Sequence, residues 1–223
     1  PDLPVTWAEE LADGLSAEAA LTGASVVGGD MSASPTLTIA VTALGDLAGR
    51  QPVTRSGARA GDVVAVVGRI GYAAAGYTVL SRGFRSPKVL VEAFRRPRVP
   101  YAAGPDAALL GANAMIDISD GLLADLGHIA DASGVHIDVR RDSLAIPQQM
   151  RDAAKALGAD PYTWLLAGGA DHALAATFPA GILLPPQWLV VGDVTGGSDR
   201  HPAGSVTVDG ASYAGRLGWD HFR

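Results

Sequence analysis

An apolar stretch that ends in two aspartates is the part of this 223-residue sequence best suited to chemistry. Met115–Leu122 predicts a strand that delivers Asp117 and Asp120 at its C-terminal end, directly before a helix. In α/β proteins ligands bind at the carboxyl ends of strands, and the free amides of a helix N-terminus suit phosphate. Two carboxylates beside a phosphate suit Mg²⁺. The structural alternative is that Asp120 caps the helix and Asp117 is a solvent-exposed residue at the strand end.

Two other stretches carry residues suited to the same chemistry. Gly28-Gly29-Asp30 follows a short apolar run, and paired glycines let a backbone approach a ligand closely. A tight turn also explains these residues and is favoured on local grounds. Arg55, in a Thr-Arg-Ser-Gly sequence, could grip phosphate oxygens bidentately, or it is a solvated loop arginine. If Asp30 met Asp117 and Asp120 between two folding units, the group could bind a polyphosphate through Mg²⁺.

The remaining candidates are aromatic. Trp219, near the C-terminus, could stack on a flat heterocycle, or it could be a hydrophobic latch on the body of the protein. His128 lies near the apolar stripe of its predicted helix and is interpreted as a packed residue rather than a ligand. The five histidines show no metal-ligand spacing.

Several enzyme classes lack their signature in this sequence. There is no Gly-x-x-x-x-Gly-Lys-Ser/Thr, which excludes a P-loop kinase, and there is no protein-kinase signature. The glycines Gly68, Gly71 and Gly76 follow a strand but do not have the dinucleotide-binding spacing. No arrangement of a nucleophilic Ser with His and Asp is supported. The absence of Cys excludes disulfides and cysteine metal clusters.

The acidic composition of the chain limits the kinds of molecule that it is expected to bind. The formal net charge is −6 with a pI of about 5.2, so general binding to nucleic acid is not expected. The basic residues between Arg82 and Arg98 are interpreted as a solvated helix face or a contact to substrate phosphate. No apolar run reaches the roughly 18 residues needed to cross a membrane, and no secretory signal is visible. We expect a soluble cytoplasmic protein with no membrane contact.

The elements that must position these residues alternate between strand and helix, which predicts the α/β class. Strands are predicted at Ser25–Val27, Thr36–Leu44, Asp62–Gly68, Ala114–Ser119, Val135–Val139, Leu174–Phe178, Leu189–Val194 and Val206–Val208. Helices are predicted at 6–23, 71–81, 87–95, 105–111, 120–130 and 147–157. Thr36–Leu44 alternates most strongly, as in a half-buried strand. The stretch from Gly45 to Asp62 is rich in Gly, Arg and Asp and is interpreted as a connector between two folding units.

Taken in order, these motifs resemble those of the thiamine-monophosphate kinase family. The matching pieces are Gly28-Gly29-Asp30, Thr54–Ala58 with Gly61-Asp62, Arg96-Pro97 with Pro100, Ile116–Leu122 with Asp125-Leu126, Gly168-Gly169 with Asp171, and Gly218–Phe222. Each piece is weak alone, whereas the ordered set is specific and spans the whole chain. The resemblance implies the two-domain α/β (α+β) fold of the aminoimidazole ribonucleotide synthetase-like superfamily, with ATP and Mg²⁺ between the domains and the N-terminal domain largely missing from this chain. It implies that residues 1–50 are the remainder of an N-terminal domain, 51–61 a connector and 62–223 an α/β domain.

The resemblance also implies an activity and a set of residue roles. The activity is transfer of a phosphoryl group from ATP to thiamine monophosphate, giving thiamine diphosphate and ADP in thiamine biosynthesis. The implied roles are Asp30, Asp117 and Asp120 as Mg²⁺ ligands, Arg55 and Ser119 as ATP contacts, and the positions of Ala170, Asp171 and Trp219 as substrate contacts. No residue is assigned covalent or acid–base catalysis. The implied protein is a cytoplasmic homodimer when its N-terminal segment is present.

Two departures from the family pattern separate this chain from a typical member. The family carries a further N-terminal segment, about a third of the protein, with a Gly-Asp-Asp motif that binds Mg²⁺ and nucleotide. Ala170 stands where the family usually has a substrate-binding Glu, and loss of one charged hydrogen bond lowers affinity by roughly ten- to a hundred-fold. Two alternatives therefore stay open: a member that binds nucleotide or thiamine phosphates without turnover, and a same-fold enzyme that activates another small molecule with ATP.

Overall fold

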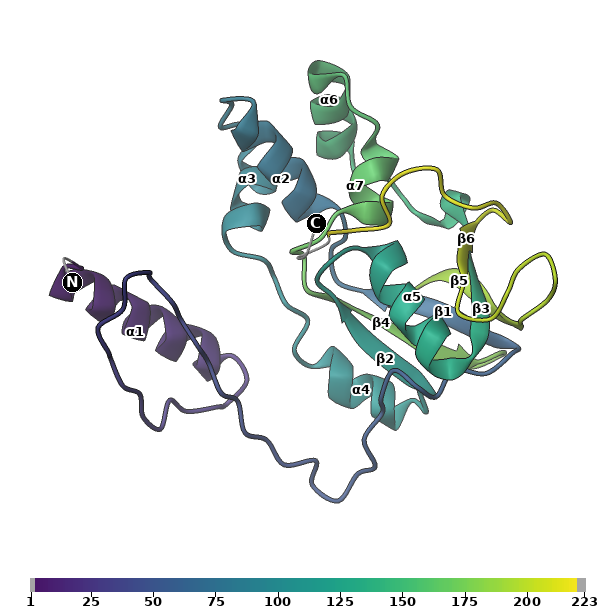
Figure 1. The fold of residues 1–223 in the computed structure, drawn as a ribbon, viewed down its shortest axis with the longest axis horizontal. Coiled ribbons are helices and arrows are strands. Elements are labelled where there is room, and N and C mark those ends of the chain that lie inside the picture. The colour runs from purple at the N-terminus through teal and green to yellow at the C-terminus, as the bar shows by residue number, and fades with distance from the viewer. Residues whose placement is uncertain (1–2, 220–223) are drawn as a thin grey trace. The chain divides into compact units, whose positions relative to one another are not determined.

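The structure, a computed structural model, describes residues 3–219 of the chain. The chain divides into two units, residues 1–51 and residues 52–223. Each unit is described by itself below. The larger unit holds every strand that the structure describes and is drawn in blue through yellow in Figure 1.

A six-stranded sheet forms the centre of the larger unit (Figure 1). Its strands, in chain order, are β1 (Asp62–Val67), β2 (Ala114–Ile118), β3 (Val135–Val139), β4 (Ala173–Pro179), β5 (Leu189–Gly196) and β6 (Val206–Val208). The order across the sheet is β2-β4-β1-β5-β3-β6. Every neighbouring pair is antiparallel except β3 and β6, which are parallel. The mixed α/β fold class is confirmed, with a sheet that is mostly antiparallel.

Helices cover both faces of this sheet. They are α2 (Tyr72–Ser81), α3 (Lys88–Arg95), α4 (Ala103–Leu109), α5 (Leu122–Ser133), α6 (Gln148–Leu157) and α7 (Pro161–Ala167), with a short 3-10 helix at Arg141–Ser143. The main core packs α2, α3, α5, α6 and α7 on one face, and a smaller cluster packs α4 on the other. Within residues 3–219 no helix has both the length and the apolar character that a membrane span requires.

Strand β1 shows why two core clusters form. Val64 and Val66 belong to the main core, whereas Ala65 and Val67 belong to the smaller cluster. Successive side chains of a strand point to opposite faces, so a continuous apolar run is buried on both sides. The predicted strand over 62–68 is confirmed as a central strand.

The topology brings three chain segments together at one end of the strands, here called the edge at the end of β2. β1 and β2 both pair antiparallel with β4, which lies between them. Val67 pairs with Leu174, and Ile118 pairs with Ala173. The residues that follow β1, follow β2 and precede β4 therefore lie at the same edge, although they come from distant parts of the sequence.

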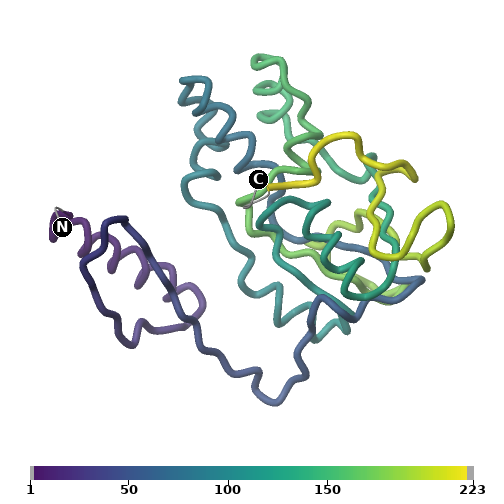
Figure 2. Tube along the Cα trace, in the orientation of Figure 1, coloured from purple at the N-terminus to yellow at the C-terminus, as the bar shows by residue number. Residues whose placement is uncertain are grey.

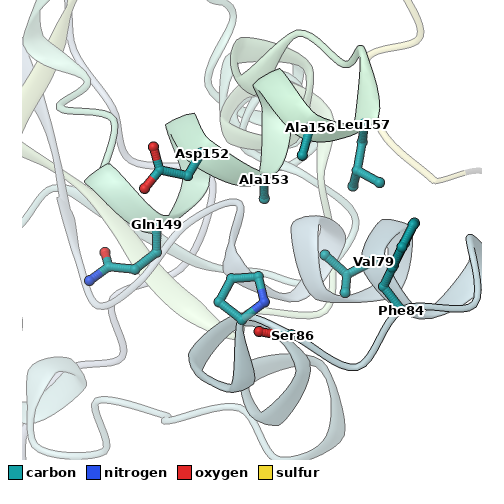
Figure 3. Close-up of a pocket in the computed structure, with 9 residues that line it drawn as sticks. Val79, Phe84, Ser86, Gln149, Asp152, Ala153, Ala156 and Leu157 are labelled. Atoms are coloured by element: carbon teal, nitrogen blue, oxygen red, sulfur yellow. The ribbon is translucent and has the colours of Figure 1, made fainter.

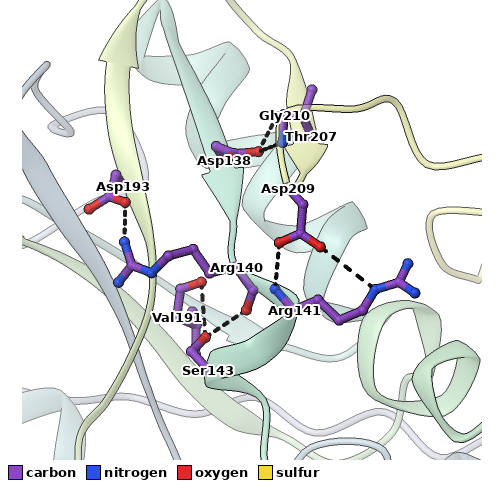
Figure 4. Close-up of polar contacts among 9 residues, drawn as sticks. All are labelled: Asp138, Arg140, Arg141, Ser143, Val191, Asp193, Thr207, Asp209 and Gly210. Carbon is purple, nitrogen blue, oxygen red and sulfur yellow. Dashed lines mark hydrogen bonds and ion pairs between the residues drawn. The ribbon is translucent and has the colours of Figure 1, made fainter.

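A network of polar contacts holds the edge strand β6 against β3 (Figure 4). The Asp138 carboxylate accepts hydrogen bonds from the Thr207 hydroxyl and from the Gly210 amide, the latter at 2.8 Å. The Arg141 amide donates to Asp209 at 3.0 Å, and the Arg141 guanidinium lies 3.9 Å from the same carboxylate. These contacts fix the point from which the last segment of the chain leaves the sheet.

The helices of the larger unit differ from the sequence-based predictions in several places, including α5, which spans Leu122–Ser133 rather than 120–130. α7 was not predicted, although its start has a clear signal: the Asp160 carboxylate accepts the Tyr162 amide at 2.9 Å, and Pro161 takes the first helical position. α4 begins at Ala103, two residues before the predicted start at Pro105.

The smaller unit has little regular structure in its described part, residues 3–51. Its one helix is α1 (Val5–Ala20), which has no buried residue. The strands predicted at Ser25–Val27 and Thr36–Leu44 are not present in the structure, and Ile39 is 52% exposed. A strand needs a partner for its backbone groups, and the described residues of this unit contain none. Apolar alternation alone was therefore an insufficient predictor here.

Candidate functional site

Three segments of the larger unit meet at the edge where β2 ends. The Ala170 amide donates to the Ser119 carbonyl at 2.7 Å, and the His172 amide donates to the Ile118 carbonyl at 3.0 Å. The Trp219 amide donates to the Asp120 carbonyl at 2.9 Å. Figure 2 shows the third segment, in yellow, returning from β6 toward the start of α5. Backbone hydrogen bonds thus join residues from three distant parts of the sequence around the end of β2.

Two glycines allow this close approach. A Cβ on Gly169 would lie 2.3 Å from the Ser119 carbonyl oxygen, and a Cβ on Gly218 would lie 2.6 Å from the Asp120 carbonyl oxygen. Both distances are far below van der Waals contact, so any larger residue would push the segments apart. Gly169 and Gly218 are therefore explained by packing around the end of β2.

The predicted Mg²⁺ ligands of this unit lie on its surface at that edge. The Asp117 side chain is 60% exposed, and its carboxylate lies 3.7 Å from Nδ1 of His172. Asp120 is half-buried. Both residues also act electrostatically on the neighbouring Asp125, where they raise its pKa and so favour the protonated form. A surface that concentrates carboxylate oxygens in this way fits a hard divalent cation such as Mg²⁺.

Asp125, rather than Asp120, stabilises the start of α5. The N-cap of this helix is Gly121, and no side chain of the cap residue itself makes the capping hydrogen bond. Instead, the buried Asp125 carboxylate accepts the amides of Asp120 at 3.0 Å and Gly121 at 3.1 Å. The alternative that Asp120 is the helix cap was therefore wrong. A capping signal was present in the sequence five residues further on.

Burial is the main cause of a raised pKa at Asp125. The two backbone amides that donate to it partly lower the pKa again, and the charges of Asp120 and Asp117 raise it further. Asp125 is thus a buried group that holds the backbone of Asp120 and Gly121, whereas Asp117 is exposed to solvent.

His128 was interpreted incorrectly as a packed residue. It is exposed, and one of its ring nitrogens lies within 4.8 Å of carboxylate oxygens of Asp120 and Asp125. The signal was the spacing of three between Asp125 and His128, which places both on one side of a helix. To the carboxylates of Asp117, Asp120 and Asp125, which together are called the acidic edge, His128 thus adds a nitrogen that could bind a metal ion.

Asp171, predicted as a substrate contact, is buried and bonded to the backbone. It is 4% exposed. Its two carboxylate oxygens accept the amides of Gly71 at 2.6 Å and Ala73 at 2.8 Å, at the N-terminus of α2. Burial raises the pKa of Asp171 to about 7, although these amides and the charge of Arg69 act in the opposite direction.

The other predicted substrate positions lie beside the acidic edge. Ala170 is half-buried and Trp219 is 66% exposed. The Trp219 backbone is held against Asp120, and the Leu217 carbonyl accepts the Ala124 amide at 3.2 Å. The rest of the motif, residues 220–222, lies outside the described residues.

The structure does not bring Arg55 or Asp30 to the acidic edge within the larger unit. The Arg55 carbonyl accepts the hydroxyl of Ser133, the last residue of α5, whereas Asp120 precedes the first. A helix of 12 residues spans about 18 Å, so the backbone of Arg55 is anchored well away from Asp120. Asp30 belongs to the smaller unit, where its carboxylate accepts the Ser32 hydroxyl at 3.1 Å. The roles of both residues stay predictions.

A cavity of about 280 Å³ lies apart from this edge, between α2, the segment before α3, and α6 (Figure 3). Its walls are mostly apolar, with Phe84, Val79 and Leu157 on one side and Gln149 and Asp152 on the other. None of the predicted site residues lines it. Within the larger unit, the candidate site is therefore the exposed edge at β2 and not this cavity.

Comparison with known proteins assigns the chain to a family. Residues 59–184 match the model of the AIR synthase related protein, C-terminal domain. The thiamine-monophosphate kinase of Mycobacterium tuberculosis is 46% identical over 222 residues, which cover 99% of this chain and 65% of that protein. The enzyme of the same name from Corynebacterium glutamicum is 38% identical over 98% of this chain and 66% of its own length.

A solved structure supports the same assignment. The structure of AaThiL complexed with AMPPCP and TMP is 30% identical, with a TM-score of 0.83 over 99% of this chain and 70% of that chain. This chain spans about 65% of the length of the Mycobacterium tuberculosis relatives. By sequence and by fold, the chain belongs to the thiamine-monophosphate kinase family, within the AIR synthase related proteins.

Proposed function

We propose that the natural protein transfers a phosphoryl group from ATP to thiamine monophosphate, giving thiamine diphosphate and ADP. The observation that carries this proposal is the similarity, over 99% of this chain, to a structure complexed with AMPPCP, an ATP analogue, and TMP. The residues at the end of β2 support the proposal, because the exposed carboxylate of Asp117, the half-buried carboxylate of Asp120, a helix N-terminus and the exposed Trp219 indole lie there.

Asp117 and Asp120 are the proposed Mg²⁺ ligands of the larger unit, and Asp30 is the proposed Mg²⁺ ligand of the smaller unit. When bound, Mg²⁺ would neutralise the charge of the phosphate oxygens. The protein's own contribution is orientation: Asp125 fixes the backbone that carries Asp120, and residues 170–172 fix the backbone that carries Ser119. Positioning of reactants accounts for a large part of catalysis when no covalent intermediate forms.

Trp219 and Ala170 define the proposed acceptor side. The exposed Trp219 indole offers a flat face to a heterocyclic ring, while its backbone is held to Asp120. Ala170 offers only a methyl group where the family usually has a carboxylate. We therefore propose weak acceptor binding, with a KM for thiamine monophosphate about ten- to a hundred-fold above that of a variant with Glu at this position.

A second candidate follows from the same residue: a protein that binds nucleotide and thiamine phosphates without turning them over. The specific observation in its favour is Ala170, because it removes a charged contact from the acceptor side without disturbing the carboxylates at β2. Arg55 and Ser119 remain the proposed ATP contacts under both candidates.

Coupled measurement of ADP release by the natural protein, with ATP, Mg²⁺ and thiamine monophosphate, tests the first candidate. We expect turnover in both the wild type and Ala170→Glu, with the lower KM in the variant. Omission of thiamine monophosphate is the control for ATP hydrolysis. Turnover in neither form would exclude the kinase, and calorimetric binding of the same ligands without turnover would establish the second candidate.

A cytoplasmic location and a homodimer complete the proposal. They rest on the family resemblance, and they are consistent with helices too short or too polar to span a membrane within residues 3–219. Sedimentation of the natural protein at micromolar concentration would test the dimer directly.

A further inference from the structure

Asp171 joins two elements that are about 100 residues apart in the sequence. Its carboxyl oxygens accept the amides of Gly71 and Ala73. These amides belong to the first turn of α2 and have no partner inside the helix. Gly71, the N-cap residue, has no side chain with which to supply that partner. A side chain from the segment before β4 thus does what a local cap residue does in other helices.

The two neighbours of Asp171 are tied to the opposite side. The amides of Ala170 and His172 donate to the carbonyls of Ser119 and Ile118, at the end of β2. Ala170 and His172 also have positive φ values of 67° and 50°, which are uncommon for residues with a side chain. Such a backbone persists only where its surroundings fix it, and here the fixing contacts come from α2 on one side and β2 on the other.

This arrangement directs successive side chains to different places. The Asp171 carboxyl is buried against α2. The His172 ring lies instead beside Asp117, with Nδ1 3.7 Å from the carboxylate. Because the Asp171 carboxyl is buried and both of its oxygens already accept backbone amides, it does not take the place of the carboxyl that Ala170 lacks.

We propose that Asp171 is a positioning residue and not a substrate ligand. It locks residues 170–172 between α2 and β2, and in this way it presents positions 170 and 172 to the acceptor. The inference rests on the proposed kinase function for its effect on turnover, but the lock itself is a property of the fold and can be tested without turnover.

The test compares Asp171→Asn with Asp160→Asn in the natural protein. The asparagine side chain of the first variant keeps one acceptor oxygen and replaces the other with a donor, so one of the two amides loses its partner. We expect the KM for thiamine monophosphate to rise about tenfold. The KM for ATP should rise by a smaller factor, because the backbone of the proposed ATP contact Ser119 is also bonded to this segment. We also expect faster amide hydrogen exchange at Gly71, Ala73 and residues 170–172. Asp160 is an exposed helix cap in α7, and its variant should leave both KM values unchanged.

Each other outcome has a defined meaning. Absence of turnover in the wild type would exclude the proposed function, and the exchange measurement would still decide the lock. Unchanged exchange at Gly71 and Ala73 in Asp171→Asn would overturn the positioning role. So would faster exchange with an unchanged KM for thiamine monophosphate, because the lock would then be structural only.

A measurement on the wild type covers the case in which Asp171→Asn does not fold. A structure of the natural protein with thiamine monophosphate and an ATP analogue should show the Asp171 carboxyl on the amides of Gly71 and Ala73. A hydrogen bond between that carboxyl and thiamine monophosphate would overturn the proposal.

Discussion

Two segments with the same apolar alternation have opposite outcomes in the two units. Thr36–Leu44 in the smaller unit alternates as a strand should, yet it is not a strand, and Ile39 is 52% exposed. In the larger unit, Val135–Val139 is strand β3, and Ile137 is completely buried. β3 has partners on both sides, β5 and β6, whereas the described residues of the smaller unit contain none. Alternation predicts which face of a strand is apolar but not whether a partner strand exists.

The predicted metal ligands show the same difference. The backbone of Asp120 is bonded to Asp125 and to the Trp219 amide, and Asp117 lies in β2, whose end is bonded to residues 170–172. Asp30 has one described side-chain contact, with Ser32 two residues away. The two predicted ligands of the larger unit therefore lie on supported backbone, whereas the predicted ligand of the smaller unit has only local support. Two predictions test this contrast, and two more test the support within the larger unit.

The largest expected effect is a difference between the two units in how much an Ile-to-Ala substitution lowers stability. Ile137→Ala should lower the free energy of unfolding by about 2–5 kcal/mol, because it leaves a cavity in the main core. Ile39→Ala should change it by less than about 0.5 kcal/mol, because the side chain is exposed. Urea unfolding of the natural protein measures both. A comparable loss in Ile39→Ala would mean that this segment is covered in the natural protein, and the contrast would then fail.

The next effect concerns activity. Asp117→Asn and Asp30→Asn should each lower kcat/KM by about a hundredfold or more, since each removes a charge from the proposed Mg²⁺ site. Neither should change the melting temperature by more than about 1 °C, because each side chain is exposed in its own unit and such substitutions have small effects on stability. Full activity in Asp30→Asn would restrict the metal site to the larger unit.

A smaller effect distinguishes support from ligation within the acidic edge. Asp125→Ala leaves two backbone amides without a partner at the start of α5, so it should lower stability by about 2–4 kcal/mol. Asp120→Asn should weaken binding of Mg²⁺ and ATP while changing stability by less than about 1 kcal/mol. Thermal unfolding together with calorimetry tests the pair, and the reverse ranking would return the structural role to Asp120.

The smallest effect is a dependence of stability on pH. Burial raises the pKa of Asp171 to about 7, so between about pH 4 and pH 7 the folded state binds the extra proton. Stability should therefore fall as pH rises through this range, by up to about 2 kcal/mol from pH 5 to pH 7. Asp171→Asn has no such titration and should reduce the slope. Equal slopes for the two proteins in urea unfolding at pH 5, 6 and 7 would contradict the assignment.

Residue patterns along the chain were sufficient for the strands of the larger unit and for the family. The predicted strands of the larger unit formed because each pattern there coincides with a pairing partner, as between β1, β4 and β5. The ordered motifs were sufficient for the family, and some of them record a close approach that the fold requires, such as Gly169 against Ser119.

Contacts between distant residues were decided only by the tertiary structure. That Asp171 caps α2 from 100 positions away, and that residues 170–172 and Trp219 meet the end of β2, both depend on which elements pack together. The sequence around an aspartate can look the same whether the residue binds a metal, caps a helix or faces solvent. Its role is set by burial and by the donors around it, and these exist only after the chain has folded.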